Sequence, residues 1–559
     1  MSLPEQWFLP RRGVSGLAGR STGYLWLALP LLAGVTLGAD TCTDNTTMVS
    51  MRDGTGLATD SFPTNGSRPA PTILFRTPYG REGMATTCQS LNQSGYAAVS
   101  QDMRGFGDSD GQFMMFTDDG WGTRQDGYDT IQWVAEQDWS NGDVCMYGAS
   151  ALSISSLLAA GSTPPALKCA YVLVGSGNLY YDVDYWGGVL REEMVVNWLQ
   201  GLGQNAALDA VELHSTDDSF WDPVSLQDRY AAVDAAIYSV GGWYDIFSQG
   251  NLDVFSGVQT GGGIQGRGHQ KLLMGPWSHG SAGPTVGELT FPDNSVLPAG
   301  EEMRWFDYHL KNVANGINGE PPVKYYLMGD VDTVSTRWNL WLTSSQWPVP
   351  STPTSYYLRS GGGLSPLAPS GSEGASYFTY DPADPVPTVG GNNLVLPAGP
   401  YDQRSVESRD DVLIFQTPVL TEPLAITGRV SATLWIASSA VDTDFAVKVT
   451  DVYPDGRSML VLDGIVRTRY REGSDHEVMM TPGAIYPISV DLWSTALVFN
   501  AGHQLRVAVS SSNSPRFQLN PNTGAPLAEE DGVLVVADQT VYHDASHPSQ
   551  LILPVVPLP

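Results

Sequence analysis

Lysine, cysteine and long apolar runs are all scarce in this chain of 559 residues. Only 5 of its 29 basic residues are lysines, and 59 acidic residues bring the formal charge at pH 7 to -30. Such a surface repels phosphate backbones and anionic lipid headgroups, which argues against a nucleic acid or a membrane surface as a partner. The chain has no internal repeat and no block of like charge. With 42% hydrophobic residues, it is long enough for about three to four globular domains.

The four cysteines include no CxxC pair and no His/Cys cluster with zinc spacing, so we expect neither a metal site nor a cofactor. Cys42 and Cys88 are the best candidates for a disulfide, which an exported chain permits. Cys145 and Cys169 fall in apolar runs that predict core strands. They are either bridged to each other or simply buried as small apolar residues.

One apolar run stands out at residues 24–39, behind a basic flank that includes Arg11, Arg12 and Arg20. The run is shorter than the about 20 residues that a membrane span needs, and it fits the apolar part of an export signal. We therefore expect residues 1–39 to be a signal peptide and the protein to be secreted or periplasmic. A retained anchor helix is the alternative.

Two different patterns divide the rest of the chain. From about residue 45 to 340, near-continuous apolar strands alternate with helices, which predicts an α/β fold with a parallel sheet covered on both faces. Residues 176–230 interrupt this series with an aromatic, helical stretch that we interpret as a cap. Further along, turns rich in Pro, Gly and Ser separate short alternating runs, which is typical of a β-sandwich or jelly roll. The predicted domains are residues 40–344 and 345–559.

The strongest candidate for chemistry is Ser150, which lies between a predicted strand and a helical run of small residues. A Gly-x-Ser turn in that setting is a nucleophile elbow, which lifts the serine hydroxyl above the sheet. A serine needs a base, and His279 follows the strand that would be the last in such a sheet. The histidine base needs an acid to orient it. Asp245 ends a predicted strand that lies between Ser150 and His279 in the sequence. The order Ser, Asp, His is that of α/β-hydrolases.

Motifs along most of the chain resemble the cocaine esterase / X-Pro dipeptidyl peptidase family, which includes α-amino-acid ester hydrolases and glutaryl-cephalosporanic acid acylases. The resemblance covers residues 45–559. Its motifs, in chain order, are MRDG (51–54), RTPYGREG (76–83), QDMRGFGDSDG (101–111), DGYDTIQWVAEQDWSNGDV (126–144), GGWYDIF (241–247), GPWSHG (275–280), WFDYHLK (305–311), TDFAVKVTDVYPDGRS (443–458) and DGIVRTRYREG (463–473).

This resemblance implies an α/β-hydrolase sheet with an inserted helical cap, followed by a jelly-roll domain. It implies a serine hydrolase with Ser150 as nucleophile, Asp245 as acid and His279 as base. It also implies that the Tyr79 hydroxyl and the backbone N–H of Ala151 form the oxyanion hole, where two donors would lower the acylation barrier by several kcal/mol.

The elbow departs from the family pattern Gly-x-Ser-Tyr-x-Gly at two positions. Ala151 replaces the tyrosine, so the pocket is expected to lose an aromatic wall. Ser153 replaces the last glycine, so we expect looser packing of the helix on the strand. Both changes bear on specificity and leave the chemistry intact. The 101–111 loop is expected to be structural, with Arg104 and Asp108 holding it near the site.

The cap is expected to supply substrate contacts, with candidates at Tyr180, Asp182, Asp184 and Trp186. Asp182 or Asp184 would bind the ammonium group of a substrate. The simpler interpretation is a solvent-exposed acid at the start of a helix. We expect cleavage of an ester or amide bond in a small molecule or short peptide through an acyl-enzyme. The alternatives are an X-Pro dipeptidyl peptidase and a catalytically weak binding protein that uses its β-sandwich. The acidic surface favours neutral or cationic substrates, and self-association stays open.

Overall fold

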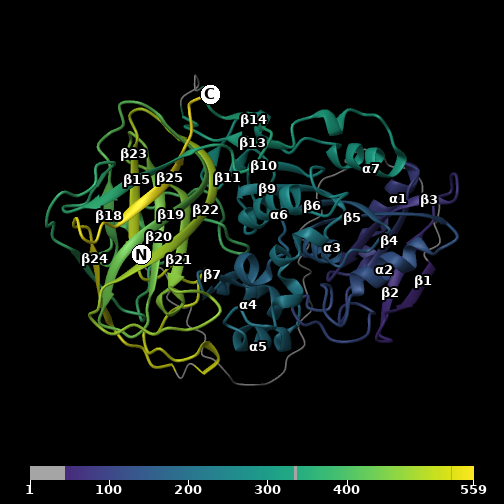
Figure 1. Cartoon of the computed structure of the whole chain (residues 1–559), viewed down its shortest axis with the longest axis horizontal. Coiled ribbons are helices and arrows are strands. Elements are labelled where there is room, and N and C mark those ends of the chain that lie inside the picture. Colours follow the sequence, from purple (N-terminus) through teal and green to yellow (C-terminus); the bar gives the residue numbers. More distant parts are fainter. Residues whose placement is uncertain (1–44, 333–336, 530–531) are drawn as a thin grey trace, which may run out of the picture. The chain divides into compact units, whose positions relative to one another are not determined.

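The computed structural model describes residues 45–332, 337–529 and 532–559, so the predicted signal peptide and Cys42 lie outside the described residues. Asp40–Pro559 form one compact unit. Two large β-sheets dominate it, with helices gathered around the first sheet (Figure 1).

The first sheet has ten strands in the order β1-β2-β4-β3-β5-β6-β9-β10-β13-β14. Its strands are β1 (Asn45–Ser50), β2 (Gly56–Phe62), β3 (Ala70–Thr77), β4 (Ala97–Asp102), β5 (Ser140–Ala149), β6 (Leu167–Leu173), β9 (Ala236–Tyr244), β10 (Lys271–Ser278), β13 (Val323–Leu327) and β14 (Leu340–Ser344). The strands from β4 to β13 pair in parallel, and the pairs at both edges are antiparallel. The carboxyl ends of the parallel strands therefore meet at one edge, where such sheets hold their ligands.

Helices cover both faces of this sheet, as its near-continuous apolar strands predicted. Ile73 and Phe75 of β3 pack on the face that carries α1 (Ala85–Gln93) and α7 (Glu301–Lys311). Leu74, between them, points to the opposite face because side chains alternate along a strand. That face carries the helices α2 (Asp126–Ala135), α3 (Ala151–Gly161) and α6 (Ser248–Gly261).

The expected cap is a separate layer of short elements. It contains η2 (Leu179–Asp184, a π-helix), β7 (Tyr185–Trp186), β8 (Val189–Leu190), α4 (Glu192–Gly201), α5 (Asn205–Leu213), η3 (Asp222–Val224), η4 (Leu226–Asp228) and η5 (Tyr230–Ala232). Leu199 of α4 and Val211 of α5 share an apolar cluster with Ile154 and Leu158 of α3. The cap is thereby packed onto the helix that follows Ser150.

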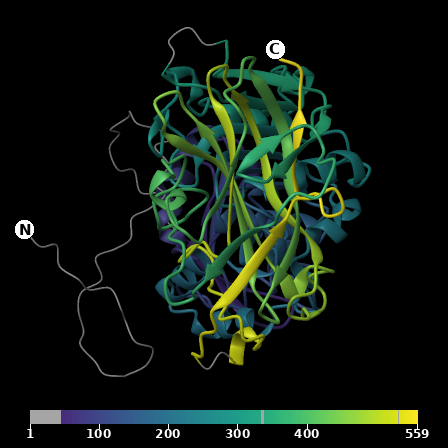
Figure 2. The ribbon, with the colours of Figure 1, turned by 90° about the vertical axis from the view of Figure 1, so that its left-hand side faces the viewer.

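The second sheet has eleven strands and faces the viewer in Figure 2. They are β15 (Thr352–Arg359), β16 (Gly363–Ser365), β17 (Ser376–Tyr380), β18 (Leu413–Gln416), β19 (Leu424–Ser438), β20 (Asp444–Val452), β21 (Ser458–Arg467), β22 (Tyr486–Phe499), β23 (Gln504–Ser510), β24 (Ala537–Tyr542) and β25 (Gln550–Val555). Nearly all of its strand pairs are antiparallel, as the regular turn spacing predicted.

The remaining elements are short connections. They are η1 (Arg81–Met84), β11 (Thr285–Val286), β12 (Leu289–Thr290), η6 (Asp293–Ser295), η7 (Ile317–Gly319), α8 (Arg404–Glu407), η8 (Thr468–Tyr470) and η9 (Leu527–Glu529). No helix within the described ranges is long and apolar enough to cross a membrane.

Cys145 and Cys169 are bridged, which decides between the two alternatives left by the sequence. They lie opposite each other on the parallel strands β5 and β6, with Cα atoms 4.6 Å apart. Cys88 is buried in the same apolar cluster. Its predicted pairing with Cys42 stays a prediction, because Cys42 lies outside the described residues.

Candidate active site

Ser150 occupies the sharp turn between β5 and α3. Its backbone has φ 57° and ψ -123°, a conformation that costs free energy for any residue other than glycine and is concentrated at functional sites. A Cβ on Gly148 would lie 2.3 Å from Cβ of Leu152, so glycine is required where the strand passes close to the helix. The turn therefore has the strained strand-to-helix geometry that the predicted nucleophile elbow requires.

His279 and Asp245 reach this serine from two neighbouring strand ends. His279 follows β10, and its Nε2 lies 2.9 Å from Oγ of Ser150. Its Nδ1 lies 2.7 Å from Oδ2 of Asp245, which follows β9. All three side chains are buried, Asp245 completely. The structure thus brings together the three residues predicted from the sequence, in the arrangement that lets a histidine take a proton from a serine.

Both the side chain and the backbone carbonyl of Asp245 accept hydrogen bonds. Its Oδ1 accepts a hydrogen bond from the backbone N–H of Phe247, at 2.7 Å. Its backbone carbonyl accepts one from the side-chain amide of Asn392, at 2.6 Å. Asn392 belongs to the part of the chain that builds the second sheet. This part of the chain therefore helps to hold Asp245 in position. These bonds fix the carboxylate that orients His279.

Tyr79 and Ala151, the residues predicted for the oxyanion hole, both lie beside Ser150. Ala151 is the first residue of α3, and an N–H at that position has no acceptor within the helix. The Tyr79 hydroxyl lies near Ser150 and accepts a hydrogen bond from Nε1 of Trp198 at 3.0 Å. About half of the Tyr79 surface is exposed, while its hydroxyl end is enclosed. That burial raises the pKa of Tyr79, so the phenol is neutral and carries a proton to donate.

A small, partly open hollow lies beside Ser150. Its walls come from the loop after β4, from α3, from the cap, from the turn after β9 and from a loop of the second sheet. The lining residues are Met115, Phe116, Ser150, Ala151, Ile154, Val183, Met194, Val195, Trp198, Ile246, Phe247 and Leu394. Ser150 is the only one with a hydroxyl, and none carries a charge. The hollow therefore suits an apolar group next to a carbonyl carbon.

The aromatic candidates of the cap lie elsewhere. Tyr180 is buried and donates its hydroxyl hydrogen to the backbone oxygen of Ser215, at 2.9 Å. Trp186 stacks on Trp493 with ring centroids 3.7 Å apart, between the cap and the second sheet. Neither side chain lines the hollow. Both were predicted as substrate contacts, and the structure places them in packing roles instead.

The two acidic candidates are buried rather than solvated. Asp182 accepts hydrogen bonds from Oγ of Ser176, at 2.8 Å, and from the Asn178 amide, at 3.4 Å. Neither carboxylate oxygen of Asp184 has a hydrogen-bond partner among the described residues, and burial raises its pKa well above the ordinary value. Val183, between them, lines the hollow. The π-helical turn sends the acids inward and the valine toward the hollow, so the prediction that an acid binds an ammonium group in this hollow is not supported.

Ser153 packs differently from the expectation of a loosened elbow. A Cβ on Gly175, just after β6, would lie 2.2 Å from Oγ and 2.5 Å from Cβ of Ser153. The missing side chain at Gly175 thus makes the room that Ser153 fills. The Ser153 hydroxyl is buried and has no hydrogen-bond partner in the described part of the chain. The helix is therefore closely packed at this point.

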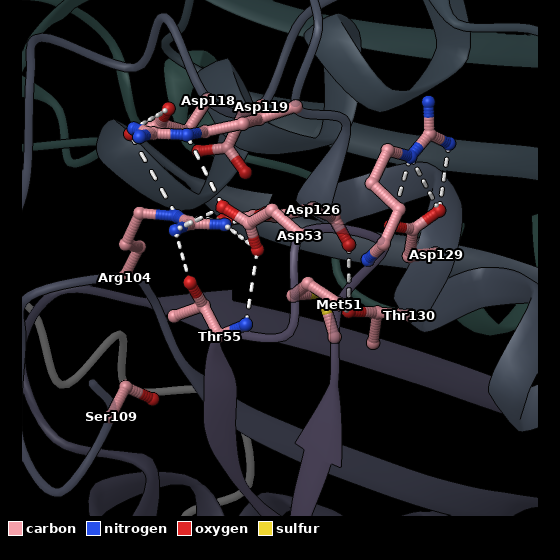
Figure 3. A network of polar contacts seen from close by, with 12 residues as sticks. Met51, Asp53, Thr55, Arg104, Ser109, Asp118, Asp119, Asp126, Asp129 and Thr130 are labelled. Atoms are coloured by element: carbon pink, nitrogen blue, oxygen red, sulfur yellow. Dashed lines mark hydrogen bonds and ion pairs between the residues drawn. The ribbon is translucent and has the colours of Figure 1, made fainter. Parts of the chain in front are cut away.

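Arg104 joins the loop after β4 to its surroundings, as the sequence indicated. Its guanidinium donates to both carboxylate oxygens of Asp126 at the start of α2, at 2.8 and 2.7 Å. It also donates to Asp53 at 2.9 Å and to the Thr55 hydroxyl at 2.7 Å, in the turn between β1 and β2. Figure 3 shows Arg104 between these partners. The network fixes the chain that leads into Met115 and Phe116 of the hollow.

Three carboxylates near the same loop lie close enough together to hold a cation. They belong to Glu82, Asp102 and Asp108. The guanidinium of Arg81 lies among them, 2.6 Å from Asp102, 2.9 Å from Asp108 and 3.1 Å from Glu82. Arg81 already supplies the positive charge, so we assign no metal to this cluster.

Several residues of the site carry no signal in the sequence. Val183 and Trp198 stand in ordinary apolar patterns of the cap. Leu394 and Asn392 lie in a Gly-Asn turn that the sequence marks only as a connection within the β-rich part. They reach the site from far along the chain, and local pattern cannot show such contacts.

Known proteins resemble this chain in sequence over most of its length. A family model described as X-Pro dipeptidyl-peptidase (S15 family) matches residues 53–210 and 199–281. A second, described as the X-Pro dipeptidyl-peptidase C-terminal non-catalytic domain, matches residues 315–552. The cocaine esterase of Rhodococcus sp. (strain MB1 Bresler) is 34% identical over 578 residues, covering 91% of this chain and 98% of that protein. The chain belongs to the cocaine esterase / X-Pro dipeptidyl peptidase family.

Other members of this family and solved structures extend the match over nearly the whole chain. A putative serine esterase of Mycobacterium bovis is 26% identical and covers 91% of this chain and 94% of its own. The structure of an alpha-amino acid ester hydrolase superposes with TM-score 0.76 at 26% identity, covering 95% and 99%. An aminopeptidase from a marine sediment Thaumarchaeota archaeon, 24% identical, shares the fold with TM-score 0.79, covering 94% and 99%.

Family membership confirms the predicted enzyme class, a serine hydrolase. It also confirms the predicted fold class, an α/β-hydrolase sheet followed by a β-rich C-terminal domain.

Proposed function

We propose that this protein is a serine esterase in which Ser150, His279 and Asp245 form the catalytic triad. The observation that carries the proposal is the continuous hydrogen-bonded chain from Asp245 through His279 to Ser150, which opens on an apolar hollow. Ser150 and His279 meet within hydrogen-bond reach, the geometry that an activated serine nucleophile needs.

The reaction follows from these positions. Oγ of Ser150 attacks the carbonyl carbon of the ester while Nε2 of His279 takes the hydroxyl proton. The tetrahedral oxyanion is stabilised by the Tyr79 hydroxyl and the N–H of Ala151. When it collapses, His279 gives its proton to the leaving alcohol and the acyl group stays on Ser150. Water, deprotonated by His279, then attacks the acyl-enzyme, releases the acid and restores the serine.

The lining of the hollow supports a neutral, apolar acyl group. A dipeptidyl peptidase must hold a free N-terminal ammonium, and a buried ammonium needs a carboxylate or several oxygens nearby. The twelve lining residues offer no carboxylate. Asp182 and Asp184 are buried away from it. The named activity of the Rhodococcus relative, an esterase, agrees with this preference.

A fluorophosphonate probe tests the nucleophile directly. We expect wild-type protein to be labelled on one serine and the Ser150→Ala variant to be unlabelled. The unlabelled variant should keep its thermal unfolding temperature, which shows that the fold is intact. Labelling that survives in Ser150→Ala would contradict the assignment.

A matched substrate pair tests the substrate class. We expect p-nitrophenyl esters of butyric or benzoic acid to be cleaved at least a hundredfold faster, by kcat/KM, than an X-Pro p-nitroanilide with a free N-terminus. An N-acetylated X-Pro anilide is the control, because blocking the ammonium should change nothing in this hollow. Preference for the free X-Pro anilide would favour the peptidase.

We also propose that the protein is exported. The basic flank and apolar run of residues 1–39 support export, and the Cys145–Cys169 disulfide agrees with an oxidising compartment. Cells that express the full chain should release a shortened protein, whose N-terminal sequence begins near residue 40. Recovery of the intact N-terminus in the membrane fraction would favour the anchor helix.

A further inference from the structure

The hydroxyl of Tyr79, which lies near Ser150, has a hydrogen-bond partner in the cap. The indole Nε1–H of Trp198, on cap helix α4, donates to it at 3.0 Å across 119 positions of sequence. The Trp198 ring is itself held, parallel to Phe116 at a centroid distance of 5.9 Å and edge-on to Phe113 at 6.0 Å. The donor therefore has a fixed position relative to the phenol.

The direction of this hydrogen bond has a chemical consequence. An indole N–H can only donate, so the Tyr79 oxygen must act as the acceptor toward Trp198. A phenol has a single hydrogen, and that hydrogen is then left for a different acceptor. Ser150 lies near the Tyr79 hydroxyl. The phenol hydrogen is thus available to the oxyanion that forms when Ser150 attacks a carbonyl carbon.

We propose that Trp198 is a positioning residue for the oxyanion hole, because its indole N–H orients the Tyr79 hydroxyl and strengthens it as a donor. The inference deepens the proposed esterase function and rests on it. Accepting a hydrogen bond polarises the phenol oxygen and makes its O–H a better donor in a site of low dielectric. A donor that is already oriented costs no reorganisation when the oxyanion forms.

Trp198 also lines the apolar hollow, so its two contributions must be separated. The wall contribution acts on binding of the acyl group and should appear in KM. The contribution through Tyr79 acts on the oxyanion and should appear in kcat and in the rate of serine phosphonylation, since a phosphonate oxygen enters the same hole. Trp198→Phe removes the N–H while keeping an aromatic ring beside Phe116.

The experiment compares Trp198→Phe, Tyr79→Phe and the double variant with wild type. The readouts are the second-order rate of fluorophosphonate labelling and the kcat for a p-nitrophenyl ester. We expect Tyr79→Phe to lose roughly a hundredfold, as for other oxyanion donors, and Trp198→Phe to lose roughly five- to tenfold, as for one hydrogen bond. In the Tyr79→Phe background, Trp198→Phe should lower neither rate further, because the hydroxyl that Trp198 orients is absent.

A matched control is Trp305→Phe on α7, which also removes an indole N–H bonded to an oxygen at 3.0 Å, here the backbone oxygen of Ala170. It should leave both rates within twofold of wild type. Equal rates for wild type and Trp198→Phe would overturn the positioning role, and so would losses that multiply in the double variant. Absence of labelling in wild type would instead overturn the esterase itself, so the two failures are distinct.

Discussion

The turn at Ser150 depends on small residues on both sides of the helix that follows it. Gly148 lets Leu152 approach β5, and Gly175 leaves the space that Ser153 fills. The sequence marked Ser153 as a departure from the family pattern and predicted looser packing. That prediction is wrong, because Gly175, just after the next strand of the sheet, compensates for the larger side chain.

Gly175→Ala tests this compensation. Its new Cβ would collide with Ser153, and overpacking of this kind costs about 1–3 kcal/mol of folding free energy. We expect a lower unfolding temperature and weaker ester hydrolysis, because α3 carries the Ala151 N–H. Thermal unfolding followed by circular dichroism measures the first effect, and kcat measures the second.

The double variant Gly175→Ala/Ser153→Gly supplies the control. Removing the Ser153 side chain should restore most of the lost stability, despite the about 1 kcal/mol that a glycine costs inside a helix. If the double variant is less stable than Gly175→Ala alone, the two residues are not coupled as the contact indicates.

At the scale of elements, a loop from the second sheet completes the active site. The backbone N–H groups of Leu394, Val395 and Leu396 all point at the buried carboxylate of Glu193, at the start of α4. The Leu394 and Leu396 bonds to Oε1 measure 3.1 and 2.7 Å. The same loop places the Leu394 side chain in the hollow. Glu193 thus ties the cap to the loop that carries Leu394, one of the residues lining the hollow.

Glu193→Ala should release this loop. Three N–H groups of a partly exposed loop lose their acceptor, and a hydrogen bond to a charged group contributes about 1.5–3 kcal/mol. We expect lower stability and a KM roughly tenfold higher for esters with a large apolar acyl group, because the Leu394 wall is no longer fixed. Acetate esters, which reach less of the hollow, should be affected less. Steady-state kinetics over a series of acyl chains measures this difference.

Glu193→Gln provides a graded comparison, because it keeps one side-chain acceptor oxygen of nearly the same size. Its KM should fall between those of wild type and Glu193→Ala. A uniform loss of kcat for all acyl chains, with KM unchanged, would argue that Glu193 acts on the triad rather than on the pocket wall.

At the scale of the whole molecule, charged groups of the cap, of α6 and of the second sheet lie close together. Asp182 of the cap lies near Asp253 of α6, and Arg429 of β19 lies 3.6 Å from Asp253. Burial raises the pKa of both carboxyl groups, although Arg429 opposes the shift. Each group therefore keeps its proton to a higher pH in the folded protein than in the unfolded chain.

This shift predicts how stability varies with pH. Between the ordinary carboxyl pKa near 4 and the raised value, the unfolded chain binds fewer protons, so the free energy of unfolding falls as pH rises. Asp182→Asn replaces one of the two titrating carboxyl groups by an amide that does not titrate. The amide keeps a side-chain oxygen that can accept the hydrogen bond from the Ser176 hydroxyl. Relative to wild type, the variant should gain about 1.4 kcal/mol or more between pH 5 and pH 8.

Chemical unfolding of both proteins at the two pH values measures that gain. A constant difference between variant and wild type would show that Asp182 does not titrate with a raised pKa. A fall in the relative stability of Asp182→Asn toward pH 8 would show the opposite sign, as expected for a carboxylate that the folded protein keeps charged.

The sequence by itself determined the fold class and the three residues at the strand ends. Parallel strands bring their carboxyl ends to one edge, so Ser150, Asp245 and His279 could be selected from local pattern, chain order and family motifs. The disulfide, the apolar hollow and its walls were decided only by the tertiary structure. Val183, Trp198 and Leu394 come together from distant segments, and whether a cap residue faces the substrate or the interior depends on the turn that carries it. That dependence is why Asp182 and Asp184 were predicted beside the substrate and are found buried within the protein.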